Sequence, residues 1–200
     1  MSSLTMHAKE ILLHPKQQWR VIDGEQETVG GLYRKYIVPL AAIGPAAAFI
    51  GMSVFGLRVP FVGRYRMPVG SALAHGIVRY VLALVGVFVL AMIIDALAPR
   101  FGGTSNRIQA LKIAAYGSTA AWLAGAFALV PALAILGVLG LYSLYLVYLG
   151  LPILMKAPEE RATTYTAAVV ASAIVVWVVF GWIAGLFVRW PAPGAYSPRS

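Results

Sequence analysis

Five stretches of this chain are long and apolar enough to cross a lipid bilayer as helices, and this feature constrains the fold most. A helical span needs about 20 predominantly apolar residues. With 60% apolar and 12% charged residues, the chain is too apolar for a soluble domain of its size, so the surplus must face lipid. We predict an all-α fold, a polytopic membrane bundle of five transmembrane helices, with spans near residues 37–57, 76–98, 110–130, 132–155 and 167–188.

Pro131 separates the third predicted span from the fourth with almost no intervening loop. A proline inside one continuous helix would remove a hydrogen bond and clash with the preceding turn. One long helix through this region is therefore excluded, and the two spans should form a tight helical hairpin.

The predicted domain layout follows from these runs and from the charges around them. Residues 1–36 form a cytoplasmic N-terminal amphipathic segment, residues 37–188 the five-helix transmembrane domain, and residues 189–200 a disordered external tail. Of the sixteen Lys and Arg residues, ten lie on the side of the N-terminus and six on the other. Because retained cations mark the cytoplasmic side, the N-terminus should be cytoplasmic and, with five spans, the C-terminus external.

The net charge of +9 does not indicate nucleic-acid binding, because no basic stretch is interleaved with stacking aromatic residues. The chain has no cysteine, which excludes disulfides, thiolate metal sites and lipidation of cysteine.

The N-terminal segment predicts two short helices. Leu4, Ile11 and Leu12 recur at helical spacing, and Pro15 suits the first turn of a second helix. An interfacial anchor in the headgroup layer is one interpretation of that second helix; the alternative is that both helices cover the cytoplasmic ends of the bundle. The anchor would comprise Lys16, Trp19 and Arg20.

Asp95 is the one acidic residue inside a predicted span, and an ionisable group there is a functional hypothesis by default. It lies near the cytoplasmic end of the second span, where Arg100, Arg107 or Lys112 could pair with it, so we favour a structural ion pair. Near the other end of the same span, His75 and Arg79 lie one turn apart and could bind an anion or titrate as a pair, although such residues more often snorkel to the interface.

Tyrosines at three-residue spacing form an oblique stripe in the fourth span. Their hydroxyls can bond a neighbouring helix, which we favour, or line a polar cavity for a solute. The stripe comprises Tyr142, Tyr145 and Tyr148 with Ser143 alongside, and its expected partners in the third span are Tyr116, Ser118 and Thr119.

Small residues recur at four-residue spacing within two spans, which lets helix backbones approach closely. These faces should pack against neighbouring helices, and they could also serve a homo-oligomer. The residues are Gly117, Ala121, Gly125, Gly181 and Gly185.

Catalytic chemistry has little support in the sequence. Three scattered histidines, no cysteine and no paired carboxylates within a span leave no nucleophile with a base, no metal set and no cofactor motif. Gly102 and Gly103 are too few for a phosphate cradle and fit a helix start capped by Thr104, Ser105 or Asn106.

Several motifs taken together resemble the YIP family of small five-span membrane proteins, and its bacterial branch most closely. The similarity covers about residues 10 to 188, and the chain departs from the family at Ala120, where the family often has a proline. The residues that carry it are Pro15, Trp19, Ile22, Tyr36, Pro39, Phe101-Gly102-Gly103, Gln109, Ala110, Lys112, Tyr116, the run 140–145, the run 149–151, Met155-Lys156-Ala157-Pro158 and Tyr165.

The resemblance implies a cytoplasmic N-terminus, five spans and the bacterial cytoplasmic (inner) membrane. Eukaryotic members resemble adaptors for Rab-type GTPases, but this chain has too short an N-terminal segment for that role to be carried over. We expect a non-enzymatic protein that organises partner proteins or lipids. The alternative is a small-solute carrier or channel with a polar path between the second, third and fourth helices. A third reading, a membrane enzyme that acts on lipid, has little support because the sequence shows no catalytic pair.

Overall fold

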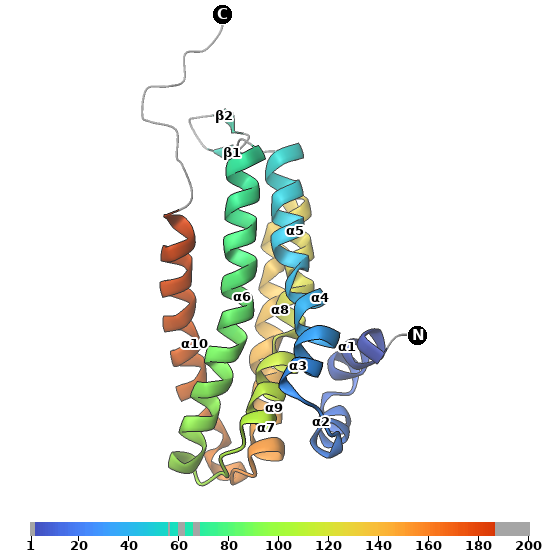
Figure 1. The fold of residues 1–200 in the computed structure, drawn as a ribbon, viewed down its shortest axis with the longest axis vertical. Coiled ribbons are helices and arrows are strands. Elements are labelled where there is room, and N and C mark those ends of the chain that lie inside the picture. The colour runs from blue at the N-terminus through green and yellow to red at the C-terminus, as the bar shows by residue number, and fades with distance from the viewer. Residues whose placement is uncertain (1–2, 56, 60–62, 66–68, 187–200) are drawn as a thin grey trace, which may run out of the picture.

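The computed structural model describes residues 3–55, 57–59, 63–65 and 69–186, and it is an elongated helical bundle with two short helices at its side (Figure 1). Those two are α1 (Ser3–Leu13) and α2 (Pro15–Gly24). They lie beside the half of the bundle that is remote from the strands β1 (Leu57–Val59) and β2 (Gly63–Tyr65) (Figure 1). The predicted tail, 189–200, and the last two residues of the fifth predicted span lie outside the described residues.

Among the described residues, four continuous helical stretches are long and apolar enough to cross a membrane. They correspond to the first, second, fourth and fifth predicted spans, and all but the fourth begin earlier in the chain than predicted. Their bounds are Val29–Ser53, Val69–Phe101, Ala132–Met155 and Glu159–Gly185.

The first stretch is a sequence of short helical segments. These are α3 (Val29–Leu32), a π-helix (Tyr33–Ile37), α4 (Val38–Ala41), α5 (Ile43–Ile50) and a second π-helix (Gly51–Phe55). Thr28 caps α3, since its hydroxyl accepts a hydrogen bond from the Gly31 amide. Prolines at 39 and 45 lack an amide hydrogen, and the changes of helix type occur around them.

The second stretch is the regular helix α6 (Val69–Leu97), and antiparallel pairing of β1 with β2 precedes it. It passes into the 3₁₀-helix η3 (Ala98–Phe101) at Pro99 and ends at Gly102, whose φ of 78° is left-handed. Asn106 then caps α7 (Arg107–Gly117), because its side chain accepts from the amides of Ile108 and Gln109. This confirms the predicted helix start after the two glycines.

The third predicted span is broken, which the sequence analysis did not predict. It consists of α7, α8 (Thr119–Ala124) and the 3₁₀-helix η4 (Gly125–Leu129). At the break, the Ser118 hydroxyl donates to Ala114 O at 2.7 Å and the Thr119 hydroxyl to Tyr116 O at 2.7 Å. Side chains that bond back to the preceding turn compete with the backbone ladder and bend helices. The helix therefore breaks at this point, although the chain has Ala120 where the family often has a proline.

The predicted hairpin at Pro131 is confirmed. Val130 has extended backbone angles between η4 and the 3₁₀-helix η5 (Pro131–Leu141), which leads into α9 (Tyr142–Met155). Both η4 and α8 pack against η5. The chain closes with η6 (Glu159–Arg161) and α10 (Ala162–Gly185), which lies against α6 and α9.

The core is concentrated in the half of the bundle that carries α1 and α2. All of α7 from Ala110 to Gly117 is buried, together with Trp19 and Ile22 of α2 and Leu146 and Leu151 of α9. The remaining half exposes large apolar side chains such as Ile135 and Trp177, as lipid-facing helices do.

Candidate functional site where the N-terminal helices join the bundle

Lys112 of α7 is buried and binds the end of α2. Its side chain is only 1% exposed, and its Nζ donates to Ile22 O at 2.8 Å and to Glu25 O at 2.5 Å. The last carbonyls of a helix lack intrahelical partners and carry partial negative charge. A lysine ammonium directed at these carbonyls gives them a hydrogen-bond donor, and their partial negative charge stabilises the buried ammonium. This explains why a cation is buried at this position.

Asp23, next to those carbonyls, is held by two other side chains. Gln109 of α7 donates from Nε2 to Asp23 O at 3.1 Å and to Oδ1 at 2.9 Å, while Lys156 forms an ion pair with Oδ2 at 2.5 Å. Gln109 and Lys112 are three residues apart and therefore share a face of α7. We call this group, Asp23 with Gln109, Lys112 and Lys156, the α2 clamp.

Trp19, one turn before Asp23 on α2, anchors this helix inside the protein. Its indole is fully buried and donates to Leu146 O at 3.0 Å. Of the two interpretations of this helix, an anchor in the headgroup layer does not fit Trp19, which packs on α9 and bonds to it; the burial of Trp19 fits the alternative that the helix covers the bundle. Lys16 and Arg20, on the outer side of α2, are exposed and line a cleft of about 330 Å³ with Tyr148 and Glu159.

Tyr116 belongs to an aromatic group beneath α1. Its ring lies 4.4 Å from that of Tyr36 and 5.7 Å from that of His7, whose Nε2 is 2.9 Å from Glu25 Oε1. The Tyr36 hydroxyl lies 2.6 Å from Thr119 Oγ1. Since the Thr119 hydrogen is already donated to Tyr116 O, Tyr36 is the donor in this pair.

Asp95 pairs locally at the start of α7. The Ser105 hydroxyl donates to Oδ1 at 2.7 Å and Arg107 Nε lies 4.0 Å from Oδ2. Of the three cations that were expected to be able to pair with Asp95, Arg107 makes the contact and Lys112 instead binds α2. Asp95 therefore fastens the loop between η3 and α7.

The tyrosine stripe of α9 faces the outside of the bundle, where Tyr148 lines the cleft beside Lys16 and Arg20. Tyr142, Tyr145 and Tyr148 are 36%, 43% and 39% exposed, and the Tyr142 hydroxyl donates to Leu12 O of α1 at 3.1 Å. The expected partners in the third span were wrong for these tyrosines. Only Ser143 reaches that span, where its Oγ accepts from the Ala121 amide freed by the helix break.

The polar residues proposed for a solute path are thus distributed over separate places. Lys112 binds α2, and Asp95 binds the loop before α7. Tyr116 packs in the aromatic group, and the tyrosine stripe lies on the outer surface. Within the described residues they do not form the continuous polar path that the carrier reading needs.

The small residues of the third predicted span pack within the chain. A Cβ at Gly117 would lie 2.7 Å from Val147 Cγ2, and one at Gly125 would lie 2.8 Å from Gly44 Cα. This confirms that the row lets helices approach closely. Gly181 and Gly185 of α10 differ, because a Cβ there meets nothing within 4 Å.

The two loops at this end of the bundle are joined through the backbone. Gly103 N donates to Ala98 O, and Thr104 N donates to Met155 O at 2.7 Å. A Cβ at Gly103 would lie 2.7 Å from the same Met155 oxygen, so this contact requires glycine. The glycine pair and the run that begins at Met155 therefore meet in space.

Asp23 and Glu25 are site residues that no sequence motif indicated, and Gln109, Gly150 and Lys156 had no predicted role beyond the resemblance. The signal was weak because Lys112 and Gln109 bind backbone oxygens, which no side-chain motif reveals. Among the residues that the structure describes, no group of three His, Asp or Glu is placed to hold a metal ion.

Comparison with known proteins agrees with the resemblance. Residues 9–180 match the model of the Yip1 domain. The inner membrane protein YohC of Escherichia coli strain K12 is 27% identical over 174 residues, covering 85% of this chain and 89% of that protein, and the same protein of Escherichia coli O6:H1 matches equally. No solved structure matches. The matched region spans the α2 clamp, the broken third segment and most of α10, and the chain is an integral membrane protein of the Yip1 domain family.

Proposed function

We propose that this chain is a non-catalytic organising protein of the bacterial cytoplasmic membrane whose N-terminal helices present a docking surface to a partner protein. The observation that carries the proposal is the α2 clamp. A buried lysine, a glutamine and an ion pair from two bundle segments hold a short helix whose own sequence is too polar and too brief to be stable alone. Such a clamp fixes the orientation of α1 and α2 relative to the membrane.

The clamped helices keep apolar side chains on their outer faces. Met6, Leu13 and Val21 are 54%, 60% and 53% exposed, whereas Ile11, Trp19 and Ile22 are fully buried against the bundle. This outer surface is what we call the N-terminal face, defined by Met6, Leu13 and Val21. Exposed apolar residues rimmed by polar ones are typical of protein interaction sites.

The proposal includes a fifth membrane crossing made by α7, α8 and η4. These segments run the chain from the end that carries α2 back toward the hairpin at Pro131 (Figure 1). Buried surroundings satisfy the break at Ser118, as membrane proteins require of non-helical backbone. Five crossings would put the two termini on opposite sides of the membrane, and the ten-to-six distribution of the sixteen Lys and Arg residues supports a cytoplasmic N-terminus and an external C-terminus.

Lys16 and Arg20 support this placement. Both are exposed beside the cleft with Tyr148, and cations at this level contact the phosphates of the cytoplasmic leaflet. The relative from Escherichia coli bears the name of an inner membrane protein, which is the same membrane.

The test places a photo-crosslinking amino acid at Leu13 or Val21 in living cells, with Ile135 as the matched control. Ile135 is 77% exposed but lies in η5, on the lipid-facing part of the bundle. We expect one discrete protein adduct from the N-terminal face and none from Ile135. Adding Asp23→Asn, which weakens the clamp, should reduce that adduct at unchanged expression.

The proposal fails if Leu13 and Val21 give no adduct, or if Ile135 gives the same one. An adduct that persists at full yield with Asp23→Asn would show that the clamp has no part in presenting the surface.

A further inference from the structure

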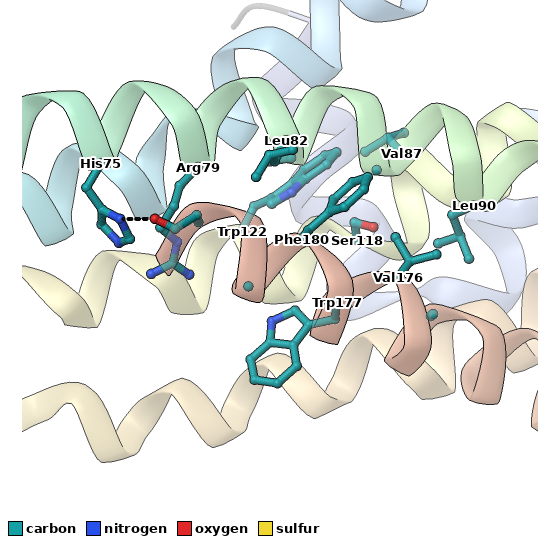
Figure 2. A pocket seen from close by; sticks show the side chains of 15 residues that line it. His75, Arg79, Leu82, Val87, Leu90, Ser118, Trp122, Val176, Trp177 and Phe180 are labelled. Carbon is teal, nitrogen blue, oxygen red and sulfur yellow. Dashed lines mark hydrogen bonds between the residues drawn. The ribbon is translucent and has the colours of Figure 1, made fainter. Parts of the chain in front are cut away.

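A groove runs between α6 and α10 in the part of the bundle remote from α2. Its cavity is about 400 Å³, within the range of small-molecule sites. Figure 2 shows His75 and Arg79 at one end, Phe180 and Trp122 in the middle and Leu90 at the other end. The lining is apolar except at the end with His75 and Arg79 and at Ser118, whose hydroxyl is already donated to Ala114 O.

Arg79 is an exposed cation, and within the described residues no acidic side chain forms an ion pair with it. All seven acidic residues lie in the first 27 residues, at Asp95 or at Glu159 and Glu160. Asp95, the acidic residue on the same helix, is sixteen positions further along α6, or about 24 Å. Because the Arg79 guanidinium is exposed at one end of an apolar groove, it is available to an anion from outside the chain.

His75 closes the charged end of the groove. Its Nδ1 lies 3.2 Å from Ala184 O, one residue before α10 ends at Gly185 (Figure 2). This contact joins the two helices and places the imidazole beside Arg79, one helical turn away. The polar end of the groove therefore lies where α10 ends.

The length of the groove matches one leaflet of a bilayer. Arg79 and Leu90 are eleven residues apart on α6, so the apolar part extends for about 16 Å. A bilayer has a hydrocarbon core of about 30 Å, of which one leaflet is about half. An apolar channel of this length and volume with a cation at one end matches one acyl chain and the anionic headgroup of a phospholipid.

Two glycines shape the groove. A Cβ at Gly86 would lie 3.3 Å from the Phe180 ring, so the glycine lets this ring pack closely on α6. Gly181 lines the cavity, and a Cβ there meets nothing within 4 Å. A side chain at Gly181 would occupy the groove without a clash.

We propose that the α6–α10 groove binds one anionic glycerophospholipid, with its phosphate at Arg79 and His75 and an acyl chain along the apolar lining toward Leu90. The headgroup charge selects the lipid, since Arg79 offers a guanidinium that can donate two parallel hydrogen bonds to a phosphate. This site is independent of the N-terminal face and lies at the other end of the bundle.

The test is native mass spectrometry of the full-length protein in detergent, titrated with phosphatidylglycerol or phosphatidylethanolamine of identical acyl chains. We expect a one-to-one adduct that is several-fold more abundant with phosphatidylglycerol. Arg79→Gln should abolish this preference and bring the two adducts to similar abundance. Gly181→Leu should remove the adduct with both lipids.

The matched control is Gly185→Leu, which is on the same helix and equally open but does not line the groove. It should bind phosphatidylglycerol as the wild type does, and thermal unfolding should show that all variants remain folded. The proposal is overturned if Gly181→Leu keeps the wild-type adduct or if Arg79→Gln keeps the preference. It is also overturned if Gly181→Leu loses a dimer of the chain that the wild type forms while its lipid adduct is not lost.

Discussion

Gly150 of α9 lies directly beneath the indole of Trp19, and a Cβ at Gly150 would be 2.9 Å from the ring carbons Cε2 and Cζ2. The absence of a side chain therefore creates the slot into which α2 inserts its largest residue. In the same slot the indole NH reaches Leu146 O at 3.0 Å, one turn earlier on α9. Glycine, indole and carbonyl together position the N-terminal helices on the bundle.

Gly150→Ala should loosen this junction. The added methyl group would force the buried ring to move, and overpacking of this kind costs about 1–3 kcal/mol. We expect a lower thermal unfolding temperature in detergent. Gly137→Ala is the matched control, because a Cβ there meets nothing within 4 Å. Equal stability of the two variants would mean that Trp19 does not occupy this slot.

Lys112→Met should release α2 while leaving the bundle in place. Methionine has a similar length but no ammonium, so the Ile22 and Glu25 carbonyls lose their donor, at a cost of about 1–3 kcal/mol. Hydrogen exchange of residues 15–24 should accelerate strongly, with little change in α6. Lys16→Met, on the exposed side of α2, should leave exchange as in the wild type. Unchanged exchange in Lys112→Met would contradict the clamp.

The apolar runs made most of the bundle predictable. The uninterrupted apolar sequences of α6 and α10 form helices in lipid, because a helix makes all of its backbone hydrogen bonds within itself. The break at Ser118 was not predictable, because a serine or threonine hydroxyl can point to solvent, to a neighbour or back to its own helix. The direction of the Thr119 hydroxyl depends here on its partner Tyr36, which lies 83 positions away in the sequence.

The candidate site was predicted less well, and the reason is the kind of partner involved. Lys112 and Trp19 both bind main-chain carbonyls, which every residue carries, so the sequence holds no mark of the acceptor. The sequence placed Lys112 near Asp95 because the opposite charge was the visible signal. The structure instead uses the carbonyls at the end of α2, which lie within reach of Lys112 because α2 packs against α9, the neighbour of α7.

The Tyr36 hydroxyl and Thr119 should be energetically coupled. Thr119 is fully buried, so Thr119→Val keeps its shape but leaves the Tyr36 hydroxyl without its acceptor. Each of Thr119→Val and Tyr36→Phe should cost about 1 kcal/mol or more. The double variant should cost clearly less than the sum of the two, measured by unfolding in detergent. Strict additivity would show that the hydrogen bond does not form.

Lys156 has a left-handed backbone, with φ of 54° and ψ of 32°, while its Nζ pairs with Asp23. A residue with a Cβ is disfavoured in that conformation by about 1–2 kcal/mol, whereas glycine is not. An exposed ion pair contributes about 0.2–1 kcal/mol. Lys156→Gly should therefore unfold at a temperature at or above that of the wild type, and Lys156→Ala below it. A Lys156→Gly variant that unfolds below the wild type would mean that the ion pair outweighs the backbone strain.

The absence of cysteine allows a direct test of the fifth crossing, because any introduced thiol is the only one in the chain. Lys9→Cys and Ser197→Cys place single thiols near the two ends. If α7, α8 and η4 cross the membrane, a membrane-impermeant maleimide added to intact spheroplasts should label Ser197→Cys, and Lys9→Cys should react only after the membrane is opened. If only the four continuous helices crossed, both thiols would be on one side and would react alike. The α2 clamp would then still hold, but the Ser118 break would lie at the membrane surface, and the proposed orientation would have to be abandoned.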